Sequence, residues 1–136
     1  MFSTTGSRIG LTVGSVAAAV GMTLLTAGPA SALTEKNGLL TQYEMGFYYN
    51  SDQGGCVFDI FYPDSNFSGD VFKGSCAGSG QSVNNNAASY HNMDVSQWSV
   101  YTGSDYSGTV GYIPAGYAGN ASSTFKNAIS SARPTG

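Results

Sequence analysis

The chain is short and weakly acidic, with 136 residues and a formal net charge of −3. A chain of this length has room for one domain. Its few basic residues are scattered, so they form no patch that could neutralise a phosphate backbone or hold the chain on an anionic lipid surface. We therefore expect neither nucleic acid nor a membrane as a partner of the exported part.

The first 32 residues have the pattern of a secretory signal peptide. Arg8 supplies a positive charge, an apolar run follows, and Ala30-Ser31-Ala32 ends the run as a small-residue cleavage site. Glycines and Pro29 interrupt the run, which argues against a permanent membrane-spanning helix. We expect cleavage before Leu33 and export from the cell. The exported part then contains four basic and eight acidic residues, which gives it a net charge of −4.

The exported part has the composition of an all-β protein. Short runs rich in Tyr, Phe, Val and Ile alternate with clusters of Gly, Ser, Asn and Asp, a pattern typical of strands and tight turns. Strands are expected at residues 44–50, 56–62, 70–73, 98–102, 109–113 and 129–133. The consecutive glycines at the end of residues 51–55 predict a hairpin turn between the first two strands. Residues 33–38 and 134–136 are expected to be frayed termini.

Two cysteines, Cys56 and Cys76, remain in the exported part. Pairing is the default in an oxidising compartment, and closing a loop of about 20 residues would stabilise the fold by about 3 kcal/mol. A catalytic thiol would need a neighbouring base, and the single histidine, His91, has no reason to lie beside either cysteine. We therefore predict a disulfide.

The sequence carries none of the usual signatures of an enzyme. One histidine rules out a histidine-rich zinc site, and the H-E-x-x-H, C-x-x-C, G-x-S-x-G and phosphate-binding glycine motifs are absent. Asp59, Asp64 and Asp70 could supply paired carboxylates, but nothing in their spacing suggests opposed partners across a cleft. We expect a protein that binds rather than catalyses.

An internal repeat is the strongest indication of the fold. Tyr62-Pro-Asp-Ser-Asn-Phe67-Ser-Gly69 and Tyr101-Thr-Gly-Ser-Asp-Tyr106-Ser-Gly108 share the frame aromatic-x4-aromatic-x-Gly, and a serine follows each at nearly the same spacing, Ser89 and Ser130. We predict two bent hairpins. Each turns at its glycine, is packed by its aromatic pair, and is held by hydrogen bonds from the later serine to its backbone.

The start of the first bend has two candidates. Residues 48–55 also fit the frame, with Gln53 in the place of the second aromatic residue. The spacing to Ser89 favours Tyr62 as the start, and Tyr48 stays the alternative.

The repeat resembles the Greek-key motif of the βγ-crystallins, which adds a later Asn/Asp-Asn/Asp-x-x-Ser/Thr-Ser element to the aromatic frame. Residues 85–90 and 126–131 match that element in part. Together with the export signal and the Tyr48-Tyr49-Asn50-Ser51 string, the repeat makes the chain similar to secreted actinobacterial proteins grouped with the Streptomyces metalloproteinase inhibitor. The resemblance covers residues 46–133, after a lead-in at 33–45 and before a tail at 134–136. It implies two four-stranded Greek keys packed as a β-sandwich.

The βγ-crystallin resemblance also implies a calcium site, because the second motif element supplies oxygen ligands there. Carried onto this chain, the ligands would be Asn85, Asn86, Ser89, Asn127, Ser130 and Ser131. Tyr90 and Lys126 stand at two positions where the motif has a ligand, and neither segment contains a carboxylate. We expect weak calcium binding or none, and no other cofactor.

The resemblance to the inhibitor group implies that the protein inhibits an extracellular peptidase through a surface loop. The candidate loops are residues 74–80, which contain Cys76, and residues 114–124. Both are rich in Gly and Ser, a poor composition for a rigid loop, and neither contains a recognisable reactive bond. The alternatives are a structural or calcium-binding extracellular module and a killer-toxin-like antimicrobial protein. A monomer is expected.

Overall fold

The computed structural model describes residues 34–136. The signal peptide predicted for residues 1–32, with its cleavage site before Leu33, lies outside the described residues. Within residues 34–136, no helix is long and apolar enough to cross a membrane. The one helical element named there is a short 3-10 helix, η3 (Phe67–Gly69).

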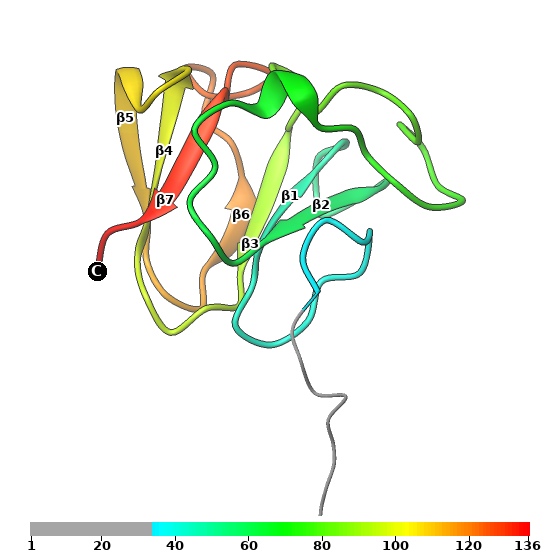
Figure 1. Cartoon of the computed structure of the whole chain (residues 1–136), viewed down its shortest axis with the longest axis horizontal. Coiled ribbons are helices and arrows are strands. Elements are labelled where there is room, and N and C mark those ends of the chain that lie inside the picture. Colours follow the sequence, from blue (N-terminus) through cyan, green and yellow to red (C-terminus); the bar gives the residue numbers. More distant parts are fainter. Residues whose placement is uncertain (1–33) are drawn as a thin grey trace, which may run out of the picture. The chain divides into compact units, whose positions relative to one another are not determined.

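The described residues form two antiparallel β-sheets (Figure 1). The larger sheet has the strand order β2-β1-β3-β6 and consists of β1 (Met45–Tyr48), β2 (Val57–Ile60), β3 (Ser89–Asn92) and β6 (Ala118–Asn120). The smaller sheet has the order β5-β4-β7 and consists of β4 (Trp98–Gly103), β5 (Ser107–Ile113) and β7 (Ser131–Pro134). The predicted all-β class is confirmed.

Each sheet receives one segment from the other half of the chain. β6 comes from the second half and pairs with β3, with Ser89 opposite Asn120. In return, Asp64 of the first half bridges Ala132 of β7, and their backbones exchange hydrogen bonds of 2.9 and 3.0 Å. Two Greek keys, residues 45–92 and 98–134, therefore interlock as the predicted β-sandwich, and the bridge at Asp64 is the shortened fourth element of the first key.

The core lies between the two sheets and follows the two-residue period of the strands. The larger sheet contributes Met45, Phe47, Phe58 and Ile60, and the smaller sheet contributes Trp98, Val100, Ile113 and Ala132, all of them buried. Burying one such large apolar side chain is worth about 1.5–3 kcal/mol. Because both halves supply the same core, neither Greek key is expected to be stable without the other.

The observed strands match most of the sequence predictions. Those at 44–50, 56–62, 98–102, 109–113 and 129–133 each overlap an observed strand, and the hairpin turn at 51–55 is confirmed between β1 and β2. The strand predicted at 70–73 is wrong, because this segment makes only an isolated bridge between Val71 and Ser82. β3 and β6 were missed because Ser-Tyr-His-Asn and Ala-Gly-Asn lack an apolar alternation.

The N-terminal segment is anchored to β2, so the expectation of a frayed end is wrong for residues 35–38. The amide of Lys36 donates to the carbonyl of Asp59 (2.6 Å). The amides of Asn37 and Gly38 donate to the carboxylate of Asp59, at 3.2 and 2.7 Å. This segment covers the outer face of the hairpin, which is why Asp59 is buried although its side chain points away from the core.

Further contacts hold both ends of the described chain. Lys36 Nζ lies 2.9 Å from Asp64 and 3.1 Å from Asp70, so the N-terminal segment is also bound to residues 64–70, the segment that crosses from β2 to β7. These two ion pairs raise the pKa of Lys36, although burial opposes the shift. At the other end, the amide of Thr135 donates to the carbonyl of Gln97 (2.8 Å), so the tail expected to fray at 134–136 is bound as well.

Candidate functional site

The two Greek keys each begin with a folded corner, at residues 48–55 and 101–108. In each corner, two consecutive residues and then a glycine have φ values between 55° and 78°: Asp52, Gln53 and Gly55, and Asp105, Tyr106 and Gly108. Left-handed backbone is costly for residues with a side chain. Other contacts must therefore hold both corners in place.

Ser89 provides those contacts in the first corner. Its hydroxyl donates to the carbonyl of Asn50 (2.6 Å) and accepts from the amide of Gln53 (2.9 Å). A serine therefore braces the bend, as predicted. The bend begins at Tyr48, however, so the preference for Tyr62 as its start is wrong and the alternative is correct.

Ser131 has the same role in the second corner. Its hydroxyl donates to the carbonyl of Gly103 (2.6 Å) and accepts from the amide of Tyr106 (3.1 Å). Ser130, which was predicted for this role, is one residue too early, and its hydroxyl donates instead to Asn85 Oδ1 (3.0 Å). Side chains of adjacent residues in a strand point to opposite sides. The hydroxyl of Ser131 therefore reaches the corner, whereas that of Ser130 points away from it.

The segment predicted as the first corner forms the crossing connection instead. Tyr62 is 62% exposed, whereas Phe67 is fully buried. Gly69 lies in η3 with open space around it and is not among the glycines with positive φ, so it does not correspond to Gly108. The amide of Phe67 donates to the carbonyl of Ser130 (2.9 Å), which places the Phe67 ring between the sheets.

The side chains of the two corners differ. In the second corner the rings of Tyr101 and Tyr106 lie 5.6 Å apart, and the guanidinium of Arg133 lies 4.3 Å from the centre of the Tyr106 ring. Burial raises the pKa of Tyr106, although Arg133 acts in the opposite direction. In the first corner Gln53 replaces the second ring, and its Nε2 donates to one carbonyl of β3 and one of β6, at 3.2 and 3.1 Å. One corner is therefore held by ring packing and the other by hydrogen bonds.

The residues expected to bind calcium lie in two loops packed against each other. The amide of Asn85 donates to the carbonyl of Ile129 (3.1 Å), and the amide of Asn127 donates to the carbonyl of Ala87 (2.9 Å). Asn85 and Asn127 both have positive φ, and each lies four residues before a bracing serine. The second motif element of the first half is therefore residues 84–89, one residue earlier than the sequence comparison placed it.

These loops fit calcium poorly. Ser89, Ser130 and Ser131 use their hydroxyls in bonds within the protein. A polar pocket of about 220 Å³ beside the loops is lined by Asn and Ser residues and by Lys126, a cation where calcium would need an anion. Within residues 34–136, no three His, Cys, Asp or Glu side chains gather as a metal site. Weak or absent calcium binding stays a prediction.

One candidate contact loop, residues 74–80, projects from the sandwich beyond β2 (Figure 1). The predicted disulfide between Cys56 and Cys76 is confirmed and joins the loop to the start of β2, with a Cα–Cα distance of 5.2 Å. Beside it, the amide of Cys56 donates to the carbonyl of Ala77 (2.9 Å). The loop is therefore fixed to the sheet by one covalent bond and one backbone hydrogen bond.

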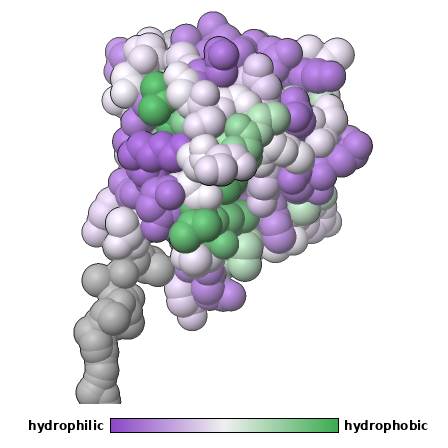
Figure 2. Space-filling model, turned by 90° about the vertical axis from the view of Figure 1, so that its right-hand side faces the viewer, coloured by the Kyte–Doolittle hydropathy of each residue, from purple (hydrophilic) through white to green (hydrophobic). Residues whose placement is uncertain are grey.

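Glycines let this loop pack tightly rather than loosen it. Gly78 has a φ of 89° and lies against the ring of Tyr49, where a Cβ would collide with ring carbons. The amide of Gly80 donates to the carbonyl of Phe72 (2.8 Å). The side of the molecule that carries the loop is mostly hydrophilic, with its largest apolar patch in the lower half and a smaller one near the upper left (Figure 2).

The other candidate, residues 114–124, is not a single loop, because β6 lies within it. Its exposed turn at 114–117 is held by Asn92 of β3. The amide of Asn92 donates to the carbonyl of Tyr117 (2.8 Å), and its side chain donates to the carbonyl of Ile113 (3.0 Å). The exposed parts of this segment are therefore the turn before β6 and residues 122–124 after it.

Comparison with known families supports the resemblance found in the sequence. Residues 61–113 match the model of peptidase inhibitor family I36. The predicted resemblance to the Streptomyces metalloproteinase inhibitor group is thereby confirmed over this segment, and family I36 is a family of peptidase inhibitors. The matched segment contains residues 74–80 and ends just before the turn at 114–117. No curated protein sequence matches this chain significantly.

Solved structures support the fold. One described as "Evolution of the eye lens beta-gamma-crystallin domain fold" has a TM-score of 0.57 and 12% identity, over 69% of this chain and 86% of that chain. A beta gamma crystallin from Ciona intestinalis has a TM-score of 0.53 and 12% identity, over 68% of this chain and 99% of that chain. At this identity the likeness shows a βγ-crystallin fold and nothing about function.

Proposed function

We propose that this protein is a secreted inhibitor of an extracellular peptidase and that residues 74–80 contact the peptidase. One observation carries the choice of loop. Within the segment that matches family I36, this loop projects from the sandwich and is bound to β2 by the Cys56–Cys76 disulfide. The turn at 114–117 lies outside the matched segment.

The constraints on the loop suit an inhibitor. A loop that is ordered before binding loses little conformational entropy when a peptidase closes around it. Two further turns fold residues 74–80 back on themselves, with the amide of Ser79 donating to Cys76 (3.2 Å) and that of Gln81 donating to Gly78 (2.9 Å). A loop held in this shape resists being drawn out into the extended conformation that cleavage requires.

The loop offers shape and backbone groups rather than charge. Its residues are small and uncharged, and nearly all of them are exposed. Lys73, at its base, is turned away, with its Nζ donating to the carbonyl of Lys36 (2.8 Å). We therefore expect inhibition that depends weakly on salt, since no charge pair steers the encounter.

A peptidase panel tests the function. Protein that begins at Leu33 is titrated against metallo-, serine and cysteine peptidases, and near-stoichiometric inhibition of one class is expected. The absence of inhibition in all three classes would overturn the function and favour a structural module.

A matched pair of variants tests the choice of loop. Ala77→Arg and Ala115→Arg place the same bulky charge on the two candidate loops, both at exposed alanines. Ala77→Arg is expected to weaken inhibition at least tenfold, and Ala115→Arg to leave it unchanged. Inhibition by Ala77→Arg equal to that of wild type would reject residues 74–80 as the contact loop while leaving the inhibitor function standing.

We further infer export after cleavage before Leu33, a monomeric state and calcium binding that is weak or absent. N-terminal sequencing of the secreted protein, its elution volume in size-exclusion chromatography, and calorimetric titration with calcium test these three points. A heat signal with a raised melting temperature would contradict the last of them.

A further inference from the structure

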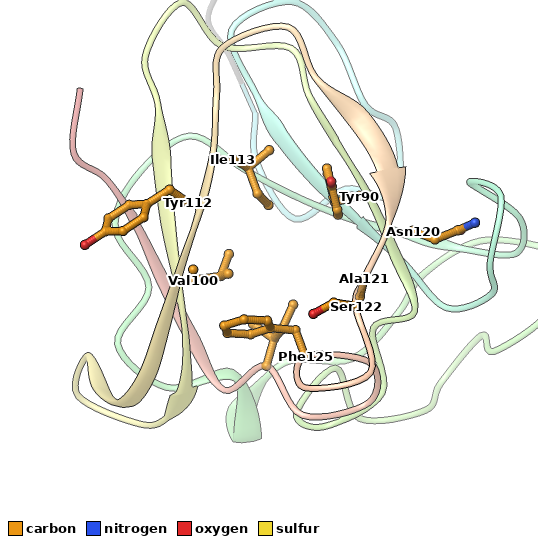
Figure 3. A pocket seen from close by; sticks show the side chains of 10 residues that line it. Tyr90, Val100, Tyr112, Ile113, Asn120, Ala121, Ser122 and Phe125 are labelled. Carbon is orange, nitrogen blue, oxygen red and sulfur yellow. The ribbon is translucent and has the colours of Figure 1, made fainter.

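A cavity of about 210 Å³ opens between the two sheets in the second Greek key. It lies between β5 and β6, the edge strands of the smaller and larger sheets. Its wall is formed by Val100, Ile113 and Phe125, with the ring of Tyr90 on one side (Figure 3). Apolar cavities of about 150 Å³ are known to accept benzene-sized ligands, so the size suits one ring with a small substituent.

The internal duplication shows what this space is shaped for. Phe47 pairs with Phe58 in the first key as Val100 pairs with Gly111 in the second, so Phe47 corresponds to Val100 and Phe58 to Gly111.

Backbone hydrogen bonds show which residue of the second key corresponds to Phe67. The amide of Phe67 donates to Ser130 (2.9 Å), and that of Ala121 donates to Ala88 (3.0 Å). The amides of Ser130 and Ala88 each donate, at 2.8 Å, to the carbonyl of the tyrosine that begins the corner of their key, Tyr101 and Tyr48 respectively. Phe58 and Phe67 therefore correspond to Gly111 and Ala121.

In the first key, aromatic rings fill the equivalent space. The Phe67 ring lies 5.4 Å from that of Phe47 and 5.1 Å from that of Phe58, both in edge-to-face arrangements. In the second key the ring of Phe125 takes part of this space, because a Cβ on Gly111 would lie only 2.8 Å from Phe125 Cζ. The counterpart of the Phe67 ring is missing, since Ala121 lines the cavity with a single methyl group.

We propose that this cavity binds a small phenol, a single aromatic ring that carries a hydroxyl group, independently of peptidase inhibition. The ring takes the position that Phe67 occupies in the first key, edge-to-face with the Phe125 ring. Such aromatic pairs add to the free energy gained by burial alone. The tight fit of three rings in the first key shows that this backbone accommodates a ring there.

The hydroxyl of the ligand has a partner at the cavity wall. The side chain of Ser122 points its oxygen into the cavity, whereas Tyr112 points away from it (Figure 3). Pockets that bind small molecules are commonly apolar with a few polar groups that fix the orientation of the ligand. Ser122 is the group that would select a phenol over an unsubstituted ring.

The test uses 4-methylphenol and the exported protein from Leu33 onward, followed by NMR. Saturable shifts are expected for the methyl groups of Val100, Ile113 and Ile129, with a dissociation constant of about 1 mM, as suits a ligand of this size. Intermolecular NOEs from the ligand ring to the same methyl groups are expected as well. Shifts that do not saturate, or NOEs to another part of the molecule, would overturn the proposal.

Two variants with the same substitution separate filling of the cavity from a general effect. Ala121→Phe supplies the missing ring and is expected to weaken binding at least tenfold. Ala118→Phe places a ring on the exposed outer face of β6 and is expected to leave binding unchanged. Equal affinity of the two variants would reject the site. If Ala121→Phe does not fold, the NOEs in the wild-type protein decide the question.

Three further ligands test the chemical class. Toluene should bind about fivefold more weakly than 4-methylphenol, and Ser122→Ala should remove that difference, as expected for one hydrogen bond. Cyclohexanol should bind more weakly than either aromatic ligand, and affinity equal to that of 4-methylphenol would reject the aromatic assignment. Tighter binding of the blocked peptide Gly-Tyr-Gly than of 4-methylphenol would show that the natural occupant is a tyrosine side chain rather than a free phenol.

Discussion

The two Greek keys share one backbone plan and fill it differently. The first packs three phenylalanine rings between the sheets, those of Phe47, Phe58 and Phe67. The second has Val100, Gly111 and Ala121 at the equivalent positions and retains a cavity of about 210 Å³. The serine hydroxyl nevertheless makes the same two bonds to the backbone in both corners, which indicates that the corners, rather than the core side chains, define the motif.

The two keys also differ in bracing. The first is bound by the Cys56–Cys76 disulfide and covered by residues 35–38, which hydrogen-bond to Asp59. The second has neither, since its position equivalent to Asp59 is Tyr112, which is 62% exposed. The half with the filled core is therefore also the half that has the disulfide and the covering N-terminal segment. We expect the first key to be the more protected part of the molecule in hydrogen exchange.

The largest expected effect on stability comes from removing one ring from the filled core of the first key. Phe67→Ala would create there the space that the second key already has, and it should lower the free energy of unfolding by about 3–5 kcal/mol. Phe125→Ala, in the half-buried ring of the second key, should cost clearly less. Urea unfolding of both variants measures the difference, and equal losses would show that the two cores are equivalent in spite of their packing.

Removing the disulfide tests the bracing. The double variant Cys56→Ala/Cys76→Ala frees a loop with a sequence separation of 20 residues, which should cost about 3 kcal/mol. It should also weaken peptidase inhibition, because residues 74–80 would then be ordered only on binding. The free energy of unfolding and the inhibition constant are measured on the same preparation. Unchanged stability would mean that backbone contacts alone hold the loop.

The bracing serines test the feature that the two keys share. Ser89→Ala and Ser131→Ala each leave one carbonyl and one amide of a corner without a protein partner, so each should cost about 1–3 kcal/mol. Ser130→Ala should cost less than about 1 kcal/mol, because its partner Asn85 is exposed and water can replace the lost bond. Thermal unfolding of the three variants compares them. A loss at Ser130 as large as that at Ser131 would contradict the assignment of the corner.

Much of this shared plan could be predicted from the sequence. The second corner, Tyr101 to Gly108, was placed correctly because both of its rings are present. The first corner, residues 48–55, was misplaced for two reasons. Gln53 stands where a ring is expected, and the segment that contains the Cys56–Cys76 disulfide lengthens the connection from this corner to Ser89. One signal could have found it, since Ser51-Asp52 and Ser104-Asp105 occupy the same place in both corners.

The cavity and the anchored N-terminus could not be predicted in the same way. The correspondence of Gly111 with Phe58, and of Ala121 with Phe67, depends on strand register, which the spacing of residues alone does not fix. The anchoring of residues 35–38 depends on Asp59, an outward-facing side chain in a strand that is buried on both faces. Such a contact leaves no periodic pattern in the sequence.

The smallest expected effect concerns the pH dependence that this anchoring gives to the first key alone. Burial, with a contribution from the nearby Glu44 carboxylate, raises the pKa of Asp59 to about 6, although the amides of Gly38 and Asn37 donate to it. The folded state therefore holds the proton more tightly than the unfolded chain does. This contribution to stability is complete in acid and is lost as the pH rises through about 6.

Between pH 5 and pH 7 the wild-type protein should therefore lose about 1 kcal/mol of stability that the Asp59→Asn variant does not lose. Asparagine does not titrate and keeps one acceptor oxygen, for the closer amide of Gly38. The bond from the amide of Asn37 to the other oxygen is lost, but that loss is the same at both pH values. Asp105→Asn, an exposed position in the second corner, is the matched control and should follow the pH profile of the wild type. Urea unfolding at the two pH values gives the comparison. Parallel profiles for wild type and Asp59→Asn would mean that the N-terminal segment binds the Asp59 carboxylate and its protonated form equally well. The contact between residues 35–38 and Asp59, which only the first key has, would then be insensitive to pH.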